Sequence, residues 1–492
     1  LLEKKTKVQA MVSLGNKRYT RLWPLVVLLT LVVILIWRNL QQARTLTLPR
    51  ISRKNFGKFL FLNDNETSSS GLSSTEDYPR DQLPEELPFL QPLIETRERS
   101  PRTLELQKLV NCRNRPLRFQ RLQHGEYWLL QNLVIGSESQ FMGCAESITY
   151  TTNGDYTFFD NLEMVAERWQ APISFAIHAP GYDLNSTLDA IQYVKNCLPG
   201  SHYINDYVTF HVYFSNLHMP VYVPLNEADV LNWPYKCMEE NGTLATPPYT
   251  QVPREAMYKV KANLTYPINV GRNIARQASN THFIFACDIE LYPSVGFVEQ
   301  FLDMVARNNS VLALDPKQPR RVYPLPVFEI EAGQHVPENK AELLDLYRNG
   351  LAQLFHAKVC PTCHKVPQQQ LWMNRAPSVR DELKLFSMTL RRDKFRSWEP
   401  FYISDNTEPL FDERVTWEGQ SNKRIQNFAM CLLGFEYHVL HPAFLVHSPG
   451  IKKQPSRKSG RLKYAKAMTK FIKSKIEPEY RILYGNTTGC TT

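Results

Sequence analysis

The chain has 492 residues, of which 43% are hydrophobic and 22% charged, and its formal net charge is +10. This composition is typical of a globular protein and excludes a largely disordered chain. No repeat recurs at a period of about 20–50 residues, which excludes solenoids and propellers. The length allows one large or two medium domains.

An apolar segment near the N-terminus, residues 22–37, runs for sixteen residues without a charge between Arg21 and Arg38. As a helix it would span roughly 24 Å, short for a hydrocarbon core of about 30 Å. Short spans suit the thinner membranes of the early secretory pathway. We therefore predict a transmembrane anchor preceded by a cytoplasmic tail at 1–21. The alternative is a cleaved signal peptide, but no small-residue cleavage site follows.

The orientation of this anchor follows from features beyond its flanking charges. Basic residues lie on both sides, so the positive-inside rule favours a cytoplasmic N-terminus only slightly. Nine cysteines fit an oxidising lumen. Asn-x-Ser/Thr glycosylation acceptors all follow the span, which predicts a single-pass type II topology. These acceptors are Asn65, Asn185, Asn241, Asn263, Asn308 and Asn486.

The rest of the chain divides into a stem, a domain and a tail. Residues 38–103 are polar and interrupted by proline, so we expect a stem that does not fold alone. From 104 to 482 apolar segments recur between turn signals, which predicts one luminal domain of mixed α/β type. A short tail at 483–492 follows.

Several elements of this domain can be placed in chain order. Residue Ser294 is expected to cap the helix whose buried face is Phe297, Val298, Phe301, Leu302 and Val305. Gly434 is expected to close the last long helix. The predicted strands are 173–178, 208–214, 282–287, 437–440 and 443–446, and the other predicted helices are 186–195, 269–277 and 422–433.

The strand at 282–287 ends in Asp288-Ile289-Glu290. Ligands of α/β sheets lie beyond the carboxyl ends of their strands. Two neighbouring carboxylates repel each other there, and a divalent cation relieves that repulsion. Oxygen ligands favour Mg²⁺ or Mn²⁺. The alternative is a polar turn that leaves the sheet.

His447 ends a second apolar strand and is followed by Gly450, Lys452 and Lys453. The glycine lets backbone approach a ligand closely, and the lysines would neutralise phosphate. An imidazole beside carboxylates shifts the metal preference towards Mn²⁺. Metal, phosphate and lysine together predict a nucleotide-sugar site; the alternative is a structural histidine.

A loop rich in proline and aromatic residues offers a general base. Inverting displacement of a nucleotide from a sugar needs a carboxylate that deprotonates the acceptor hydroxyl. Asp412 or Glu413 is the first choice and Glu399 the second. The alternative is a structural carboxylate paired with Arg414.

Two further features have competing interpretations. Cys360-Pro-Thr-Cys363-His364 suggests zinc, but the compartment favours disulfides. Cys287, inside a predicted strand, is the expected free thiol, which leaves eight cysteines for bridges. Residues 452–475 hold ten basic and no acidic residues; we interpret them as a solvated helix, or as a site for an anionic ligand. Nucleic acid is not expected in a lumen.

Together these motifs resemble glycosyltransferase family 49. The resemblance covers roughly residues 104–482, with its motifs in family order. They are NLTYPINVGRNIARQASNTHFIFACDIELYPS, PVFEIE, ENKAELLDLY, CPTC, WEPFYI, FDERV, NKRIQNFAMCLLGFEYHVL and FLVHSPGIKK.

This resemblance implies a GT-A type fold, Mn²⁺ as cofactor, and inverting transfer from UDP-glucuronate. The expected acceptor is a xylose-terminated glycan, as in the O-mannosyl glycan of dystroglycan, and the expected location is the Golgi membrane. It implies a metal site at Asp288, Glu290 and His447. It also implies donor contacts from Arg272, Asn273 and Arg276, with a weaker match at Thr151 and Thr152.

The sequence departs from the family pattern at two points. Glu290 stands where the family has aspartate, and Ser-Pro-Gly follows His447. Two alternatives therefore remain open: the same fold with another UDP-sugar, or a non-catalytic relative that binds glycan. The expected partners are a glycoprotein acceptor and a second copy or another transferase.

Overall fold

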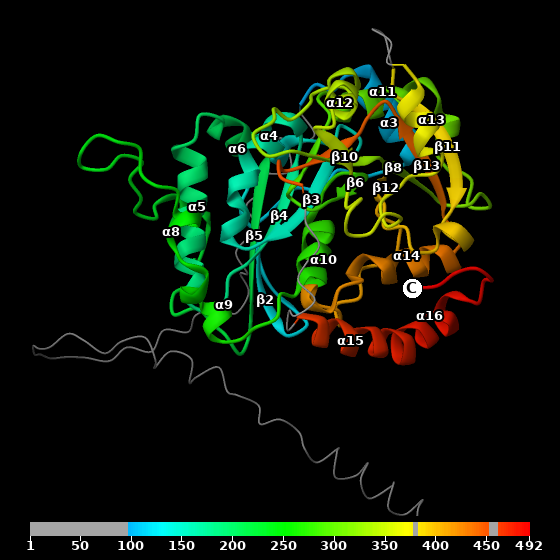
Figure 1. Ribbon diagram of the computed structural model, residues 1–492. Helices are drawn as coiled ribbons and strands as arrows, with labels where there is room; N and C mark the ends of the chain where they lie inside the picture. The colour runs from blue at the N-terminus through cyan, green and yellow to red at the C-terminus, as the bar shows by residue number, and fades with distance from the viewer. Residues whose placement is uncertain (1–96, 377–381, 452–460) are drawn as a thin grey trace, which may run out of the picture. The chain divides into compact units, whose positions relative to one another are not determined.

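The computed structural model describes residues 97–376, 382–451 and 461–492 (Figure 1). They all fall within one unit, Glu86–Thr492. The predicted anchor at 22–37 and nearly all of the predicted stem lie outside the described residues. Within these ranges, no helix combines the length and apolar character needed to cross a membrane.

A mixed sheet forms the centre of the described part of the chain (Figure 1). Strands β5, β4, β3 and β6 are parallel neighbours, so their carboxyl ends share one edge. In order across the sheet, the strands are β1 (Gln120–His124), β2 (Tyr127–Val134), β5 (Val208–Ser215), β4 (Ile173–His178), β3 (Ile148–Gly154), β6 (Phe283–Ala286), β12 (Phe401–Ser404), β8 (Arg321–Leu325), β13 (Glu436–His441) and β11 (Lys384–Leu390).

A smaller sheet holds β10 (Ala352–Leu354), β9 (Val327–Ile330), β14 (Leu445–His447) and β7 (Leu291–Pro293), in that order. The short strand β7 directly follows the acidic motif after β6 and pairs antiparallel with β14. This pairing brings segments about 150 residues apart in sequence to the same place.

Helices cover both faces of the large sheet because its central strands are buried on both sides. Along β4, Phe175 and Ile177 join the main core with the helices on one face, whereas Ala176 packs against α10 on the other. The long helices are α3 (Pro101–Val110), α4 (Leu162–Trp169), α5 (Asp183–Asn196), α10 (Ile268–Ala278), α11 (Phe297–Arg307), α12 (Lys340–Arg348), α14 (Asn422–Leu432), α15 (Arg461–Phe471) and α16 (Glu477–Tyr484). Shorter ones are α6 (Ser201–Tyr207), α7 (Glu227–Leu231), α8 (Pro248–Gln251), α9 (Tyr258–Lys261) and α13 (Gln369–Asn374).

Most elements predicted within the described ranges are confirmed to within a few residues. The buried face of α11 is also confirmed, and Gly434 follows α14 with a left-handed φ of 74°. The proposed cap of α11 is wrong. Gly296 occupies the cap position without a side-chain bond, and Ser294 Oγ instead accepts from the Phe444 backbone amide at 3.4 Å.

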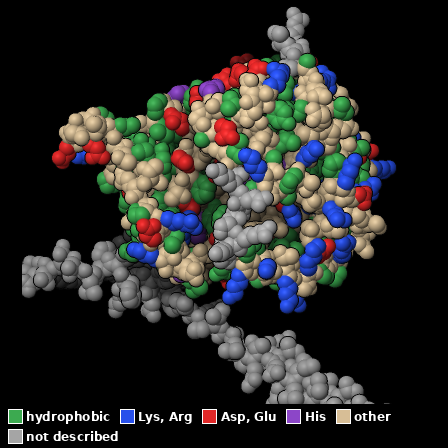
Figure 2. Space-filling view, in the orientation of Figure 1, with side chains coloured by type: hydrophobic (Ala, Val, Ile, Leu, Met, Phe, Trp, Pro, Cys, Tyr) green, Lys and Arg blue, Asp and Glu red, His purple; other side chains and the backbone are tan. Residues whose placement is uncertain are grey.

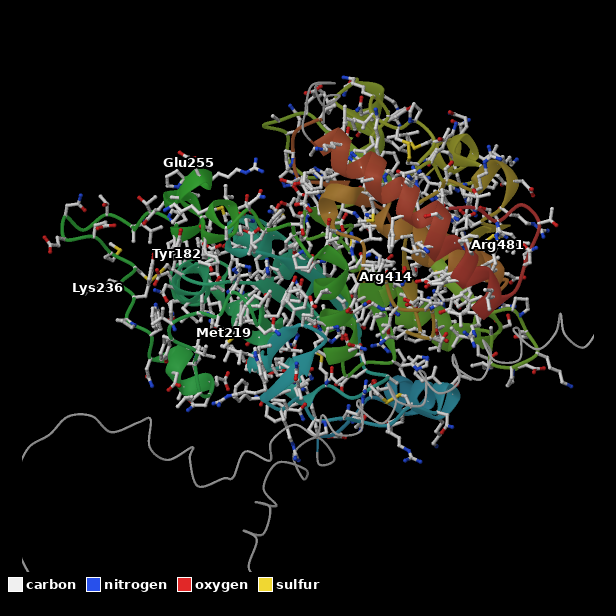
Figure 3. All side chains as sticks on the ribbon, turned by 90° about the horizontal axis from the view of Figure 1, so that it is seen from below. Tyr182, Met219, Lys236, Glu255, Arg414 and Arg481 are labelled. Carbon is white, nitrogen blue, oxygen red and sulfur yellow. A yellow bond between two sulfur atoms is a disulfide. The ribbon has the colours of Figure 1, made fainter. Side chains whose placement is uncertain are left out.

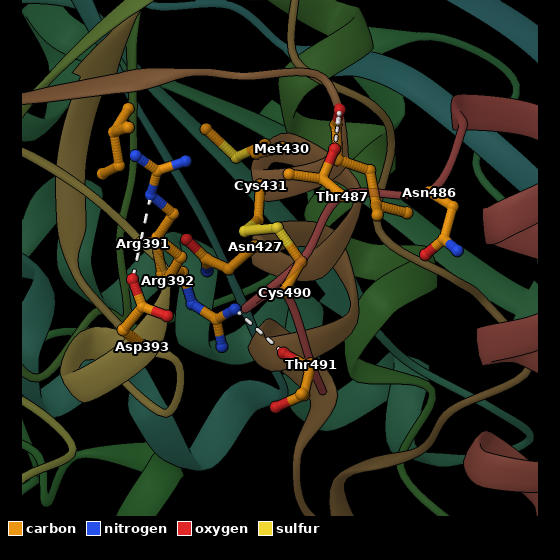
Figure 4. Close-up of a disulfide and its surroundings, with 12 residues drawn as sticks. Arg391, Arg392, Asp393, Asn427, Met430, Cys431, Asn486, Thr487, Cys490 and Thr491 are labelled. Atoms are coloured by element: carbon orange, nitrogen blue, oxygen red, sulfur yellow. Dashed lines mark hydrogen bonds and ion pairs between the residues drawn. A yellow bond between two sulfur atoms is a disulfide. The ribbon is translucent and has the colours of Figure 1, made fainter.

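Four disulfides are present in the described residues, and Cys287 is the buried free thiol, as predicted. The zinc interpretation of Cys360 and Cys363 is wrong because these two residues form a disulfide. The other bridges are Cys112–Cys144, Cys197–Cys237 and Cys431–Cys490. The last one ties the C-terminal segment to α14, and Arg391 Nη1 donates to the Thr491 carbonyl nearby (Figure 4).

The surface agrees with two expectations. Every glycosylation acceptor in the described residues has an exposed asparagine: Asn185, Asn241, Asn263, Asn308 and Asn486. Asn65 lies outside those residues, and modification itself stays a prediction. The described part of the basic run forms α15 and the helical turn after it, with exposed Lys463, Lys466, Lys470, Lys473 and Lys475. Basic side chains are frequent over this part of the surface (Figure 2).

Gly271 sets how closely α10 can approach the sheet. A Cβ at this position would lie 2.8 Å from both Asn153 Cβ and Tyr213 Oη. We expect Gly271→Ala to lower the free energy of unfolding by about 1–3 kcal/mol, since the helix must move away from β3. Thermal unfolding of the variant against wild type measures this. Gln277→Ala, at an exposed position of the same helix, should change stability by less than about 0.5 kcal/mol; equal effects of the two would contradict the packing argument.

Candidate active site

The acidic motif lies at the carboxyl end of β6, next to the carboxyl end of β3. The buried Tyr150 of β3 fixes its backbone: its hydroxyl donates to the Asp288 carbonyl at 2.8 Å and to the Leu291 carbonyl at 2.9 Å. Burial raises the pKa of Tyr150 well above its ordinary value. This phenol therefore remains a donor and holds both ends of the motif.

Asp288 lies between two cations. Its Oδ1 accepts from Arg272 Nη2 at 2.8 Å and its Oδ2 accepts from Lys423 Nζ at 2.9 Å. Burial raises the pKa of Asp288, but the charges of Lys423 and Arg272 outweigh it and bring the pKa far below the ordinary range. Asp288 is thus ionised, with both oxygens engaged.

Glu290 and His447 are brought together by the small sheet. In the β7–β14 register Leu291 is opposite His447, and the Ser448 amide donates to the Glu290 carbonyl at 2.7 Å. Glu290 Oε2 lies 3.8 Å from His447 Nε2. His447 is 5% exposed, and the Phe355 ring stacks on it at 5.4 Å between centroids.

The imidazole of His447 has the tautomer of a metal ligand. Nδ1 lies 2.8 Å from the Ser448 carbonyl, which can only accept, so Nδ1 carries the proton. In the neutral imidazole Nε2 then presents a lone pair, and it has no hydrogen-bond partner among the residues that the structure describes. A buried lone pair that faces a carboxylate oxygen fits a cation between the two groups.

These residues fit a divalent metal ion only in part. No cluster of three or more His, Cys, Asp or Glu arranged to hold a metal occurs among residues 97–376, 382–451 and 461–492. Glu290 and His447 face each other, whereas Asp288 binds Arg272 and Lys423. The predicted set of three ligands is therefore not assembled among the described residues, and a metal ion at Asp288 would have to compete with its two cationic partners.

The predicted donor residues differ in what they contact. Thr151 and Thr152 are buried near the carboxyl end of β3, and neither hydroxyl has a hydrogen-bond partner within the described part of the chain. Arg272 reaches Asp288, whereas Asn273 and Arg276 hold the loop after β12. Asn273 exchanges hydrogen bonds of 2.9 Å with the Phe411 backbone.

Arg276 is 1% exposed, and every contact described for its guanidinium is to this loop. It pairs with Glu408 at 3.1 Å and also donates to Asn406 Oδ1 and to the Pro409 carbonyl. A donor contact from Arg276 stays a prediction, and its present bonds make it a positioning residue. Lys452 and Lys453 lie outside the described residues.

The three candidate bases occupy different environments. Asp412 has a 4% exposed side chain, which accepts from Arg414 through both oxygens and from Tyr480 at 3.2 Å. Arg414 (Figure 3) also pairs with Glu479. Asp412 therefore matches the structural alternative, a carboxylate paired with Arg414.

Glu399 and Glu413 are both paired, but Glu413 is the more accessible. Glu399 Oε1 accepts from Arg424 Nε at 2.6 Å, and its side chain is 15% exposed. Glu413 Oε1 accepts from Asn273 Nδ2 at 2.8 Å and lies 2.7 Å from His124 Nε2, with its side chain 34% exposed. Of the three, Glu413 best combines a fixed orientation with access for an acceptor.

The sequence reasoning missed the start of α14. Asn422 Oδ1 accepts from Arg272 at 2.8 Å, Lys423 binds Asp288, and Arg424 binds Glu399. These three residues begin the segment NKRIQNFAMCLLGFEYHVL, which was interpreted from sequence only as an amphipathic helix and a family motif. The available signal was a run of polar residues before the apolar face of the helix. Such a run does not identify ion-pair partners that are distant in sequence.

Comparison with known proteins identifies the family. A model described as "Glycosyl-transferase for dystroglycan", glycosyltransferase family 49, matches residues 147–485. The chain belongs to this family. It is therefore a glycosyltransferase.

Several relatives carry more specific names. The chain is 28% identical over 366 residues to a zebrafish (Danio rerio) β-1,4-glucuronyltransferase 1, covering 72% of this chain and 80% of the relative. The human β-1,4-glucuronyltransferase 1 is 27% identical over 231 residues, covering 45% and 51%. The human xylosyl- and glucuronyltransferase LARGE1 is 24% identical over 221 residues, covering 45% and 27%.

The contact between His124 and Glu413 makes stability depend on pH. The hydrogen bond to Glu413 raises the pKa of His124 above its ordinary value of about 6.5, despite partial burial. Because this pKa is higher in the folded state than in the unfolded chain, protonated His124 stabilises the fold fully below about pH 6.5. The contribution is lost as pH rises through the folded-state pKa. We expect His124→Gln to lower the melting temperature at about pH 6 and to have little effect at about pH 9.

Melting temperatures across this pH range test the linkage. His202→Gln is the matched control, because His202 is exposed and contacts Tyr203 rather than a carboxylate. A decrease in melting temperature of His124→Gln that stays constant with pH would show that His124 acts through packing alone.

Proposed function

We propose that this glycosyltransferase transfers glucuronic acid from UDP-glucuronate to a glycan, with inversion and with Mn²⁺ bound at the edge of its sheet. The observation that carries the proposal is the buried Nε2 of His447, which has no hydrogen-bond partner among the described residues and faces Glu290. We propose that the sheet and its site belong to a fold of the GT-A type.

The proposed metal ligands are Asp288, Glu290 and His447. A bound Mn²⁺ would supply positive charge that stabilises the departing diphosphate. The imidazole of His447 favours Mn²⁺ over Mg²⁺ among these oxygen ligands. The buried hydroxyls of Thr151 and Thr152 would contact the nucleotide, since the end of β3 adjoins the acidic motif.

We propose glucuronate as the donor sugar for two reasons. The zebrafish relative that covers 72% of this chain and the human relative that covers 45% are both named β-1,4-glucuronyltransferase 1. In addition, Arg424 supplies a cation at the start of α14, and a sugar carboxylate would suit such a charge. A xylose-terminated glycan on a glycoprotein is the proposed acceptor, and a single-pass type II position in the Golgi membrane the proposed location.

Within this proposal Glu413 is the general base. Asn273 and His124 hold one carboxylate oxygen, Oε1, and orient the other for the acceptor hydroxyl. The carboxylate would take the hydroxyl proton while the acceptor oxygen attacks the sugar carbon opposite the diphosphate. Asp412 keeps the adjacent loop in place through Arg414 and Tyr480.

Replacement of the base gives a kinetic test. We expect Glu413→Gln to lower kcat by at least about 100-fold with little change in KM for the donor, because only proton removal is lost. Steady-state kinetics with UDP-glucuronate, Mn²⁺ and a β-xyloside acceptor measure this. Glu479→Gln, a change at an exposed carboxylate that also pairs with Arg414, is the control. A Glu413→Gln variant that keeps more than a tenth of kcat would exclude Glu413 as the base.

A donor panel tests the sugar. With Mn²⁺ present, we expect UDP-glucuronate to raise the melting temperature of the full chain more than UDP-xylose, UDP-glucose or UDP-N-acetylglucosamine, because of its carboxylate. The shift should vanish in Glu290→Ala. A larger shift with a neutral sugar would favour the alternative donor, and no shift with any UDP-sugar would favour a non-catalytic glycan-binding relative.

A further inference from the structure

The ion pair between Lys423 and Asp288 competes directly with a metal ion. Lys423 Nζ lies 2.9 Å from Asp288 Oδ2, and Arg272 holds the other oxygen, Oδ1. A metal ion bound by Asp288 needs one of these oxygens, and its positive charge repels the cationic group that this oxygen now binds. Metal binding therefore favours movement of one of the two cations away from Asp288.

Arg272 is the cation that stays. Its side chain is 6% exposed and makes two further hydrogen bonds, to Asn269 Oδ1 at 3.1 Å and to Asn422 Oδ1 at 2.8 Å. Its guanidinium also lies 5.1 Å from the centre of the Phe411 ring. Displacing Arg272 would break all of these contacts at once.

Lys423 is the cation that can leave. Its ammonium bonds to Asp288 and lies 3.7 Å from the centre of the Phe401 ring. A lysine has a flexible four-carbon stem and three rotatable donors, so it can turn to a new anion without movement of the helix backbone. The new anion must be close to the metal, which is where a nucleoside diphosphate would lie.

We propose that Lys423 is an internal counterion that occupies the Asp288 oxygen in the free enzyme and moves to the diphosphate when a nucleoside diphosphate and metal bind. This proposal rests on the metal site under Proposed function. It makes Lys423 the residue that couples metal binding to donor binding. A metal ion that binds alone meets the positive charge of Lys423 at Asp288. A metal ion that binds with a nucleoside diphosphate does not, because Lys423 has moved to the diphosphate.

The coupling can be measured by Mn²⁺ binding to the purified full chain, followed by electron paramagnetic resonance of free Mn²⁺, with and without UDP. We expect Lys423→Met to bind Mn²⁺ at least about tenfold tighter than wild type without UDP, because the competing charge is gone. We also expect the gain in Mn²⁺ affinity produced by UDP to be at least about tenfold smaller in this variant. Lys423→Arg keeps the charge and should resemble wild type more closely than Lys423→Met does.

Two controls separate this proposal from other effects. Lys470→Met removes an exposed lysine of α15 and should leave both affinities unchanged. Melting temperatures of each variant identify unfolding, and Lys423→Arg serves as the charge-retaining comparison, whose coupling should stay close to that of wild type. Unchanged Mn²⁺ affinity and unchanged coupling in folded Lys423→Met would overturn the role of Lys423. If wild type itself binds neither Mn²⁺ nor UDP, the proposed function fails instead.

Discussion

The enclosure of Asp288 by Arg272 and Lys423 is the interaction on which the site depends. A carboxylate at the end of a buried strand is costly unless a cation compensates its charge. Here the compensating cations come from α10 and from the start of α14, so the charge balance links two helices to the sheet edge. Asn422 extends this link because it also binds Arg272.

The same edge is assembled from segments that are far apart in sequence. Tyr150 of β3 fixes the backbone on both sides of the acidic motif, and the β7–β14 pair brings His447 to Glu290. Asn273, the neighbour of Arg272 on α10, orients Glu413. One helix thus contacts both Asp288 and Glu413 through adjacent residues, and helix geometry fixes the separation of these two contacts.

Local sequence patterns were sufficient to predict most of the helices and strands named from the sequence, and to choose Cys287 as the free thiol. Strand β4 is predicted without error because its six residues are apolar enough to be buried on both faces. The role of Lys423 was not predictable, since an ion pair over 135 residues has no local signature. The choice between Asp412 and Glu413 likewise depended on Arg414, Tyr480 and His124, whose positions only the fold supplies.

The length of the side chain at position 290 decides how close its carboxylate comes to His447. The Ser448 amide and the β7–β14 register fix the backbone of Glu290, so side-chain length alone decides how far its carboxylate reaches. An aspartate here, as the family pattern has, would withdraw the carboxylate by about one C–C bond, roughly 1.5 Å. The present side chain already lies 3.8 Å from His447 Nε2. The longer residue therefore brings its carboxylate closer to His447, and the proposed metal site depends on this approach.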